Sequence, residues 1–340
     1  MTLQTEPVPR PHPVVVVIGE LGGGPPPGLD RIAGRVEFRY ARTRSELDAA
    51  LPDAEAALLW DFGSPLLAES LRGAVSLRWI HVAGAGVDAV LTPALVESEI
   101  ALTNAHGVFD RSVAETVAGM LLVFVKDVIG TVELQQSRQW RHRETEMLAG
   151  QTALVLGAGG IGREIARVLA ALAVDVTVVA SSERTDAELG VVRSIDDLDE
   201  LLGDVDFVVL VLPLTDDTRD LFDADRFRLM KRTARLVNVG RGELVDEEAL
   251  VAALRSGEIA GAALDVFREE PLPTDHPLWA LPNVLVSPHM SADFRGWLDA
   301  LADQFIENLE RWLDDRPLVN VVGKRRGYVP GNRGHDERTA

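Results

Sequence analysis

The sequence predicts an α/β protein with parallel sheets, divided into two domains. At 340 residues the chain is long enough for about two domains of ordinary size. Short runs of β-branched residues alternate with segments of helical spacing, which is typical of parallel sheets covered by helices. One glycine-rich turn, Gly157–Gly162, lies between an apolar run and a helical segment and indicates a nucleotide-binding unit.

The N-terminal elements form the first α/β unit. Val14–Ile18 is a β-branched run of the kind found in buried parallel strands. The GGGPPPG run at Gly22–Gly28 is interpreted as a loop, because three consecutive prolines lack N–H donors and oppose the start of a helix. The remaining elements expected here are strands at Ala56–Trp60, Leu77–Val82 and Ile100–Thr103, with helices at Ser45–Leu51 and Ser64–Arg72.

The second half begins with a long apolar helix, which we expect over Ser112–Val132 with Ser112 as its cap. A polar connector, Glu133–Arg143, follows and carries Trp140. The nucleotide-binding unit then supplies strands at Thr152–Leu156, Val174–Ala180, Phe207–Leu212, Ala234–Val239, Gly261–Val266 and Val284–Val286. Ser291–Leu313 is predicted to form a closing helix, and the tail after Tyr328 is predicted to be disordered.

Composition excludes several classes of function. The net charge of −19 without basic patches argues against a nucleic-acid partner. The absence of cysteine excludes disulfides, thiolate catalysis and cysteine zinc sites, and we predict no metal site. No apolar run reaches membrane-spanning length, and Met1–Pro13 lacks the apolar core of a signal peptide, so we expect a cytoplasmic protein with no membrane partner.

The turn Gly157–Gly162 has the spacing G-x-G-x-x-G that binds a dinucleotide pyrophosphate. Gly157 makes the tight turn, Gly159 lets the backbone approach the phosphates, and Gly162 lets the helix close on the strand. The pyrophosphate then meets the free N–H groups and the positive end of the helix dipole. A tight strand–helix turn without a ligand is the structural alternative.

Three other strand ends carry side chains suited to chemistry on a carbonyl acid. Arg241 stands between two glycines after an apolar strand, and its guanidinium offers a bidentate fork to a carboxylate. Glu270 and His289 follow the ends of two further strands. In open α/β sheets these ends face one ligand crevice, so we expect the three residues to act together. A histidine paired with a carboxylate has its pKa raised, and it can donate a proton to a developing alkoxide at neutral pH.

From Leu77 to Tyr328 the chain resembles the D-isomer-specific 2-hydroxyacid dehydrogenase family. The motifs that carry the resemblance, in chain order, are AGAGVD (83–88), NAHG (104–107), SVAE (112–115), GAGGIG (157–162), LPLT (212–215) with Thr218, VNVGRG (237–242), LDVF (264–267), EPL (270–272) and SPH (287–289). The resemblance implies two Rossmann-like or flavodoxin-like domains with parallel sheets and an active-site cleft between them. It places the substrate domain at residues 1–103 and 290–340, and the cofactor domain at residues 104–289.

The same resemblance implies roles for individual residues. Arg241 would bind the substrate carboxylate, His289 would act as acid and base, and Glu270 would orient His289. Backbone amides of Ala83, Gly84 and Ala85 would also hold the carboxylate. The cofactor-binding residues implied are Gly157, Gly159, Gly160, Ile161, Gly162, Leu212, Pro213, Thr218, Val239, Gly240 and Asp265, with Asp265 holding the nicotinamide carboxamide.

The cofactor is expected to be NAD(H) or NADP(H), and one departure favours NADP(H). NAD-specific members carry an acid at the end of the second strand, where it binds the ribose 2′-hydroxyl. In this chain that position is Ala180, followed by Ser181, Ser182 and Arg184, which suit a 2′-phosphate. Glu183 is the alternative, because its carboxylate suits the ribose of NAD(H).

The implied activity is reduction of a small 2-oxo acid, such as glyoxylate or hydroxypyruvate, to the D-2-hydroxy acid. Two alternatives stay open: a dinucleotide-sensing or corepressor-like protein, and a dehydrogenase of a different small carboxylic acid. We expect selectivity to depend on Val82–Val87, His106, Phe109 and Met290–Trp297. The resemblance also implies a homodimer through the cofactor domain, in which Trp140 either reaches the neighbouring subunit or packs locally.

Overall fold

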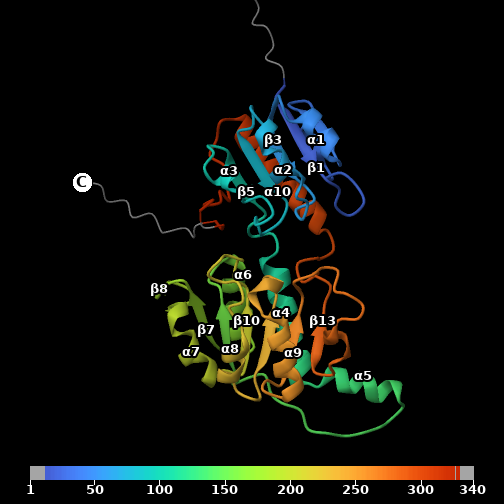
Figure 1. Ribbon diagram of the computed structural model, residues 1–340, viewed down its shortest axis with the longest axis vertical. Helices are drawn as coiled ribbons and strands as arrows, with labels where there is room; N and C mark the ends of the chain where they lie inside the picture. The colour runs from blue at the N-terminus through green and yellow to red at the C-terminus, as the bar shows by residue number, and fades with distance from the viewer. Residues whose placement is uncertain (1–11, 326, 330–340) are drawn as a thin grey trace, which may run out of the picture. The chain divides into compact units, whose positions relative to one another are not determined.

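The computed structural model describes residues 12–325 and 327–329. The chain divides into two compact units (Figure 1). Unit 1 comprises Met1–Val108 and Arg295–Ala340, and unit 2 comprises Phe109–Phe294. The sequence-based boundaries at 103/104 and 289/290 lie close to these positions. Each unit is a parallel α/β structure, so the predicted fold class is confirmed.

Unit 1 is built on a five-stranded parallel sheet in the order β2-β1-β3-β4-β5. The strands are β1 (Val14–Ile18), β2 (Glu37–Ala41), β3 (Ala54–Leu59), β4 (Trp79–Val82) and β5 (Ala101–Asn104). This is the flavodoxin-like order, in which the chain reverses direction across the sheet between β1 and β3. The central strands are buried except at Glu55 of β3, and they are mostly apolar, as expected for a sheet covered on both faces.

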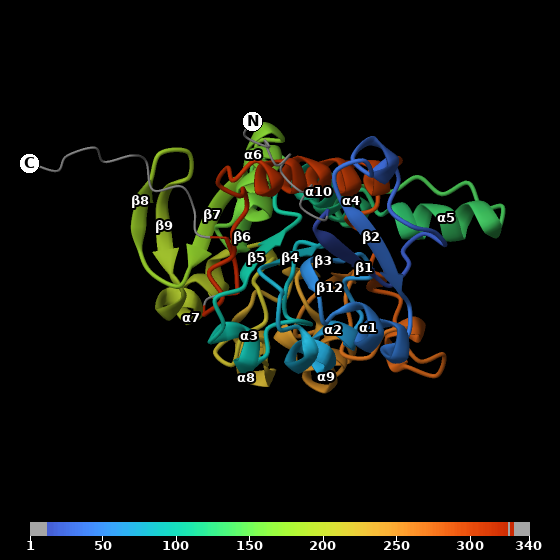
Figure 2. The same ribbon diagram turned by 90° about the horizontal axis from the view of Figure 1, so that it is seen from above.

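Helices cover both faces of this sheet (Figure 2). One face packs against α1 (Arg44–Ala50), α2 (Leu66–Ser70) and α3 (Pro93–Val96), through residues such as Leu47, Leu67 and Leu95. The other face packs against α10 (Trp297–Leu313), where Phe305 stacks on Trp79 of β4 with ring centroids 5.6 Å apart. The C-terminal helix therefore completes the core of the N-terminal sheet.

Unit 2 is built on an eight-stranded sheet in the order β13-β12-β11-β10-β6-β7-β9-β8. Its strands are β6 (Thr152–Leu156), β7 (Asp175–Ala180), β8 (Arg184–Asp186), β9 (Gly190–Ser194), β10 (Phe207–Leu210), β11 (Arg235–Asn238), β12 (Gly261–Leu264) and β13 (Val284–Val286). All pairs are parallel except β8 with β9. The chain changes direction at β6, and that switch point is where open α/β sheets bind nucleotides.

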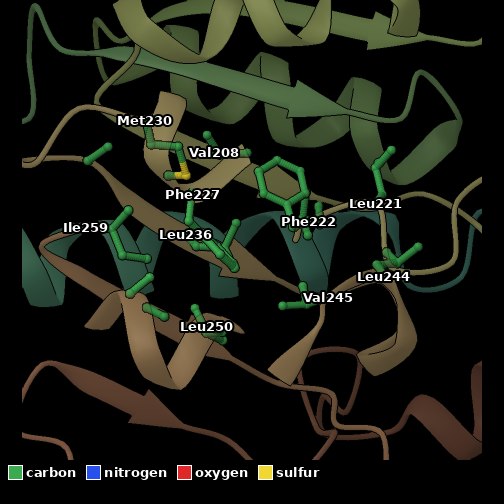
Figure 3. Close-up of a cluster of buried hydrophobic side chains, with 14 of the residues drawn as sticks. Val208, Leu221, Phe222, Phe227, Met230, Leu236, Leu244, Val245, Leu250 and Ile259 are labelled. Carbon is green, nitrogen blue, oxygen red and sulfur yellow. The ribbon is translucent and has the colours of Figure 1, made fainter. Parts of the chain in front are cut away.

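The helices of unit 2 also lie on both faces of its sheet. On one face α4 (Asp110–Val125) packs against α6 (Gly160–Ala171). On the other face lie α7 (Leu198–Leu201), α8 (Ala224–Leu229) and α9 (Glu247–Ser256). Figure 3 shows the apolar cluster that they bury against the sheet, centred on Phe222 and Phe227, whose rings are 6.0 Å apart.

Two predicted helices are wrong in their boundaries. The helix expected at Ser112–Val132 is two helices, α4 and α5 (Val128–Gln136), separated by Asp127 in the left-handed conformation at φ 46°. Asp127 caps α5 by accepting a hydrogen bond from Gly130 N. Ser112 is not a cap, because α4 begins at Asp110 and the Ser112 hydroxyl donates to Ser291 O.

The closing helix begins at Trp297 and not at Ser291. Gly296, at φ 90°, precedes its first turn, and Ser291 N is bound by the Asp265 carboxylate. The residues between, as far as Phe294, belong to unit 2. The tail predicted to be disordered lies, beyond residue 329, outside the described residues. Within the described ranges no helix is long and apolar enough to cross a bilayer.

Candidate active site

The glycine turn joins β6 to α6, and its backbone is packed too closely for side chains at Gly157 and Gly162. Gly157 has φ 129°, and a Cβ there would lie 2.8 Å from Val211 O. A Cβ on Gly162 would lie 1.8 Å from Gly157 O, so only glycine lets this helix pack so closely on the strand. Beside Gly159, by contrast, a Cβ would meet nothing within 4 Å. The turn is therefore packed on the protein side and open where a ligand would approach.

The first turn of α6 presents unpaired backbone donors. Gly159 is the N-cap residue and supplies no side-chain hydrogen bond to the helix. The first N–H groups of an α-helix have no partner within the helix, so those of Gly160, Ile161 and Gly162 are available to an anion. The arrangement suits a pyrophosphate.

The His289 imidazole is hydrogen-bonded to the Glu270 carboxylate in unit 2. His289 Nδ1 lies 2.7 Å from Glu270 Oε2, and the other carboxylate oxygen accepts from Phe267 N at 2.9 Å. Both side chains are partly exposed, with 42% and 36% of their surfaces accessible. Glu270 thereby fixes the imidazole ring and leaves Nε2 for another partner.

The electrostatics of this pair favour the protonated form of the imidazole. The hydrogen bond to Glu270 and the charge of that carboxylate raise the pKa of His289, although burial and the Arg241 charge oppose them. Burial acts to raise the pKa of Glu270, but its bonds to His289 and Phe267 N and the nearby Arg241 charge lower it overall. The charge of Arg241 acts on both partners, so the structure brings the three predicted residues together.

Asp265 anchors the loop that carries His289. Its side chain is fully buried after the end of β12. Oδ1 accepts from Ser287 Oγ at 2.6 Å and from Met290 N at 2.9 Å, and Oδ2 accepts from Ser291 N at 2.9 Å. These three bonds fix the loop on both sides of His289, which has the left-handed conformation at φ 52°.

Arg241 follows β11 on a loop that a buried asparagine holds. Asn238 donates to Arg241 O at 2.8 Å and accepts from Gly240 N at 3.1 Å. A Cβ on Gly242 would lie 2.0 Å from the Phe267 carbonyl carbon, so the loop packs directly on the segment that leads to Glu270. Arg241 therefore starts from a fixed backbone.

The remaining predicted cofactor residues follow neighbouring strand ends of the same sheet. Thr218 holds the loop after β10, because its Oγ1 donates to Pro213 O at 2.8 Å and accepts from Thr215 N at 2.8 Å. That loop contains Leu212, and Val239 and Gly240 come directly after β11. The parallel order of β10, β11 and β12 brings these loops and Asp265 to one edge of the sheet.

Beyond the end of β7 the structure adds a second cation to the predicted group. Ser181, Ser182 and Arg184 are all exposed. Arg193, which sequence reasoning missed, lies on β9 in register with Val179 of β7. Its guanidinium pairs with Asp197 at 2.9 Å and with Glu183 at 3.8 Å. Glu183, the alternative ribose ligand, therefore lies beside a cation.

In unit 1 the loop after β4 is the predicted carboxylate-binding loop, and one of its three predicted amides is already hydrogen-bonded within the sheet. Ala83 N donates to Leu59 O at 3.0 Å, so this amide is committed to the sheet and the expectation for it is corrected. In the described part of the chain, the N–H groups of Gly84, Ala85 and Gly86 donate no hydrogen bond. Gly86 is thus a donor that the sequence analysis missed.

No cluster of three or more His, Asp or Glu side chains in residues 12–325 and 327–329 is arranged to hold a metal ion. The candidate chemistry is proton transfer at His289, charge recognition at Arg241 and dinucleotide binding along the edge of the unit 2 sheet.

Comparison with known proteins defines the class to which this fold and site belong. The profile of the D-isomer-specific 2-hydroxyacid dehydrogenase NAD-binding domain matches residues 118–291. The chain belongs to this family of NAD(P)-dependent oxidoreductases.

Three relatives place the chain within the family. A glyoxylate reductase of Thermofilum pendens is 35% identical over 257 residues, covering 74% of this chain and 76% of the relative. The D-3-phosphoglycerate dehydrogenase of Methanocaldococcus jannaschii is 33% identical over 85% of this chain, which spans 55% of that protein's length. Among solved structures, an NADPH-dependent glyoxylate/hydroxypyruvate reductase from Sinorhizobium meliloti, in complex with NADP and sulfate, is 30% identical, with a TM-score of 0.80 over 93% of this chain and 100% of that one.

Proposed function

We propose that this protein uses NADPH to reduce a small 2-oxo acid of the glyoxylate or hydroxypyruvate type to its D-2-hydroxy acid. The observation that carries the proposal is the His289–Glu270 pair, 2.7 Å apart, beside the Arg241 charge. The relatives named glyoxylate reductase and glyoxylate/hydroxypyruvate reductase support the same substrate class.

Each residue of the trio has a separate task in this reaction. Nicotinamide, when bound, supplies the hydride that reduces the 2-oxo carbon. Arg241 binds the carboxylate and draws electron density towards the carbonyl oxygen. His289, whose protonated form Glu270 favours by raising its pKa, gives its Nε2 proton to the oxygen as negative charge develops there. Glu270 keeps the imidazole oriented and stabilises its charged form.

The test measures how fast the purified protein oxidises NADPH and NADH when glyoxylate, hydroxypyruvate, pyruvate or a bulkier 2-oxo acid is the substrate. We expect turnover with at least one of the small acids, and a fall of about 10²–10⁴-fold in His289→Ala. Tight binding of the dinucleotide without turnover of any acid would contradict the proposal and favour a sensor or a different carboxylic acid.

NADPH preference is part of the proposal. The cations Arg184 and Arg193 flank the end of β7, and the position of the usual ribose-binding acid is Ala180. Solved relatives at 30% identity contain NADP or NADPH. A higher kcat/KM with NADH than with NADPH would exclude this preference.

We also propose that the N–H groups of Ala85 and Gly86 bind the substrate carboxylate. They have no other partner in the described part of the chain, and successive N–H donors of this kind form an anion-binding nest. Replacing either residue by proline removes a donor, so Gly86→Pro should weaken oxalate binding, and unchanged binding would argue against the role.

The protein is further proposed to be a cytoplasmic homodimer, formed through α5 and the segment after it. These extend from the rest of unit 2 (Figure 1). They expose Val128, Val132 and Trp140, the last completely. Arg143 holds the segment in place through bonds to Asp127 and Thr131. Light scattering of the wild type and of Val132→Asp tests the proposal, because a monomer in both would exclude it.

A further inference from the structure

Each unit has a buried asparagine as the last residue of a strand. Asn104 ends β5 and is 3% exposed, and Asn238 ends β11 and is 1% exposed. Asn104 bonds the loop after β4, which carries Ala85 and Gly86, and Asn238 bonds the loop that carries Arg241. Burying a primary amide is costly unless both of its ends are paired, so these two side chains need a reason to be there.

Both amides are hydrogen-bonded at the nitrogen and at the oxygen, and in the same way. Asn104 Nδ2 donates to Ala85 O at 2.5 Å, and its Oδ1 accepts from His106 N at 3.3 Å. Asn238 Nδ2 donates to Arg241 O at 2.8 Å, and its Oδ1 accepts from Gly240 N at 3.1 Å. In both asparagines the backbone N–H of the residue two positions later fixes the amide oxygen. The amide NH₂ group is thereby oriented towards a single backbone carbonyl.

In unit 1 that carbonyl, Ala85 O, decides where the Gly86 N–H points. A trans peptide places C=O and the following N–H on opposite sides. Gly84 O accepts from Ala105 N at 2.9 Å, so Ala85 N–H points away from β5. Ala85 O accepts from Asn104, so Gly86 N–H points away from Asn104. Both N–H groups therefore point away from the end of β5, which leaves them open to an anion.

In unit 2 the same device fixes the backbone of Arg241. Asn238 binds the residue before Arg241 through its oxygen and Arg241 itself through its nitrogen. On the other side Gly242 lies against Phe267, where a Cβ would be 2.0 Å from the carbonyl carbon. The guanidinium therefore projects from a backbone held on both sides.

We propose that Asn104 and Asn238 are positioning residues for the substrate carboxylate, Asn104 acting through the Gly86 N–H group and Asn238 through Arg241. Neither asparagine contacts the substrate in this scheme. The inference rests on the proposed function, because it assumes that these groups bind a carboxylate. It adds two residues that hold the Gly86 N–H group and the Arg241 backbone in position before the substrate binds.

Asn104→Asp and Asn238→Asp test the proposal with almost no change in shape. Each keeps the oxygen that accepts from the backbone N–H and places a second oxygen against a carbonyl. Repulsion should then turn that peptide, and we expect KM for the 2-oxo acid to rise about tenfold or more in each variant. In Asn104→Asp the KM for NADPH should stay unchanged, because the dinucleotide residues lie in unit 2.

Asn308→Asp is the matched control in unit 1. Asn308 is fully buried on α10, and its amide makes the same kind of two-ended contact, to Val319 O at 3.0 Å and Val319 N at 2.9 Å. No proposed ligand group depends on it. It should lose a similar amount of stability and keep the wild-type KM. Asn283→Asp, whose amide bonds Leu254 O and Ala260 O, serves unit 2.

Asn104→Ser and Asn238→Ser cover the case in which an aspartate variant does not fold, since serine is neutral but too short to reach the carbonyl. Calorimetric binding of oxalate to the NADP-loaded protein is the second readout.

If the wild type reduces no 2-oxo acid, the proposed function fails, and the oxalate measurement still tests the asparagines. Weaker oxalate binding in the Asn104 and Asn238 variants than in the two controls supports the inference. Wild-type KM and wild-type oxalate binding in folded serine variants overturn it.

Discussion

At the scale of single residues, the site depends on a carboxylate that holds a histidine in its charged form. Glu270 raises the pKa of His289 through a hydrogen bond and through its charge. In the proposed reduction the protonated imidazole is the active species. Activity should therefore be retained up to a pH above the ordinary histidine value of about 6.5 and fall as the pH rises through the raised pKa.

Glu270→Gln should move this alkaline limb to lower pH. Glutamine keeps the shape and an acceptor for Nδ1, but it removes the negative charge, so the pKa of His289 falls. The measurement is kcat/KM for 2-oxo acid reduction from pH 5 to 9, with the dissociation constant of NADPH as a control that should not change. A profile superimposable on that of the wild type would show that Glu270 does not set the protonation of His289.

A substitution at Gly162 tests whether the glycine turn binds the dinucleotide. A Cβ at this position would lie 1.8 Å from Gly157 O, so Gly162→Ala must push α6 away from β6. The N–H groups of the first turn then leave the pyrophosphate position, and we expect NADPH to bind about tenfold more weakly, a loss of about 1.4 kcal/mol. Gly119→Ala on α4, where a Cβ meets nothing within 4 Å, is the control and should bind NADPH normally.

The sequence was sufficient to predict residues whose position follows from a strand end. Arg241, Glu270 and His289 each follow a strand of one parallel sheet, and such ends share an edge. Gly86 and Arg193 could not be found in this way. The availability of Gly86 N depends on which N–H groups the sheet and Asn104 already use, and Arg193 approaches β7 only because β9 pairs with it.

At the scale of elements, the strand interiors were predictable because apolar, β-branched runs suit buried parallel strands. Helix ends were harder to predict. The break at Asp127 depends on a left-handed residue that is also bound by Arg143, and the late start of α10 depends on the Asp265 carboxylate, which binds Met290 N and Ser291 N. Both are contacts between segments distant in the sequence, which local periodicity does not contain.

The β8–β9 hairpin is the element that sets cofactor preference in our proposal. Arg163, on the first turn of α6, forms a two-pronged contact with Asp186 of β8. That guanidinium, with the N–H groups of Glu188 and Leu189, lowers the pKa of Asp186 although burial opposes them. The hairpin is thereby fixed to the nucleotide-binding turn, with Arg184 and Arg193 at its two strands.

Arg184→Ala and Arg193→Ala should each raise KM for NADPH about tenfold and leave KM for NADH nearly unchanged, because only NADPH carries the 2′-phosphate. Steady-state kinetics with both cofactors measure this. Arg167→Ala on α6 removes the same charge from an exposed ion pair with Glu164 and should alter neither value. Equal losses with NADPH and NADH would assign the two arginines a structural role.

At the scale of the whole molecule, unit 1 carries a buried histidine that makes its stability depend on pH. His81 is completely buried on β4, shares a hydrogen bond of 2.8 Å with Thr103 Oγ1, and packs against Phe305 of α10. Its Nε2 has no partner among the described residues. Burial alone lowers its pKa to about 3, and no charged neighbour contributes to the shift.

The sign of the effect follows from where the proton binds. Between pH 6.5 and about 3, the unfolded chain protonates His81 and the folded chain does not, so unfolding is favoured as the pH falls through this range. A single such group costs about 1.4 kcal/mol for each pH unit below 6.5. Since α10 packs on this histidine, the loss falls on the contact that joins the C-terminal helix to the N-terminal sheet.

His81→Phe should make the free energy of unfolding less dependent on pH. Phenylalanine keeps a ring beside Phe305 and does not titrate, while Trp79 Nε1 continues to donate to Thr103 Oγ1. The quantity to compare is the free energy of unfolding of wild type and variant from pH 7.5 to 5, because contributions from acidic residues and from His289 are common to both and cancel in the difference. Relative to the wild type, the free energy of unfolding of the variant should rise by about 1.4 kcal/mol for each pH unit below 6.5. Parallel curves for the two proteins would mean that His81 is protonated in the folded state, and that water or a local rearrangement of α10 reaches its Nε2.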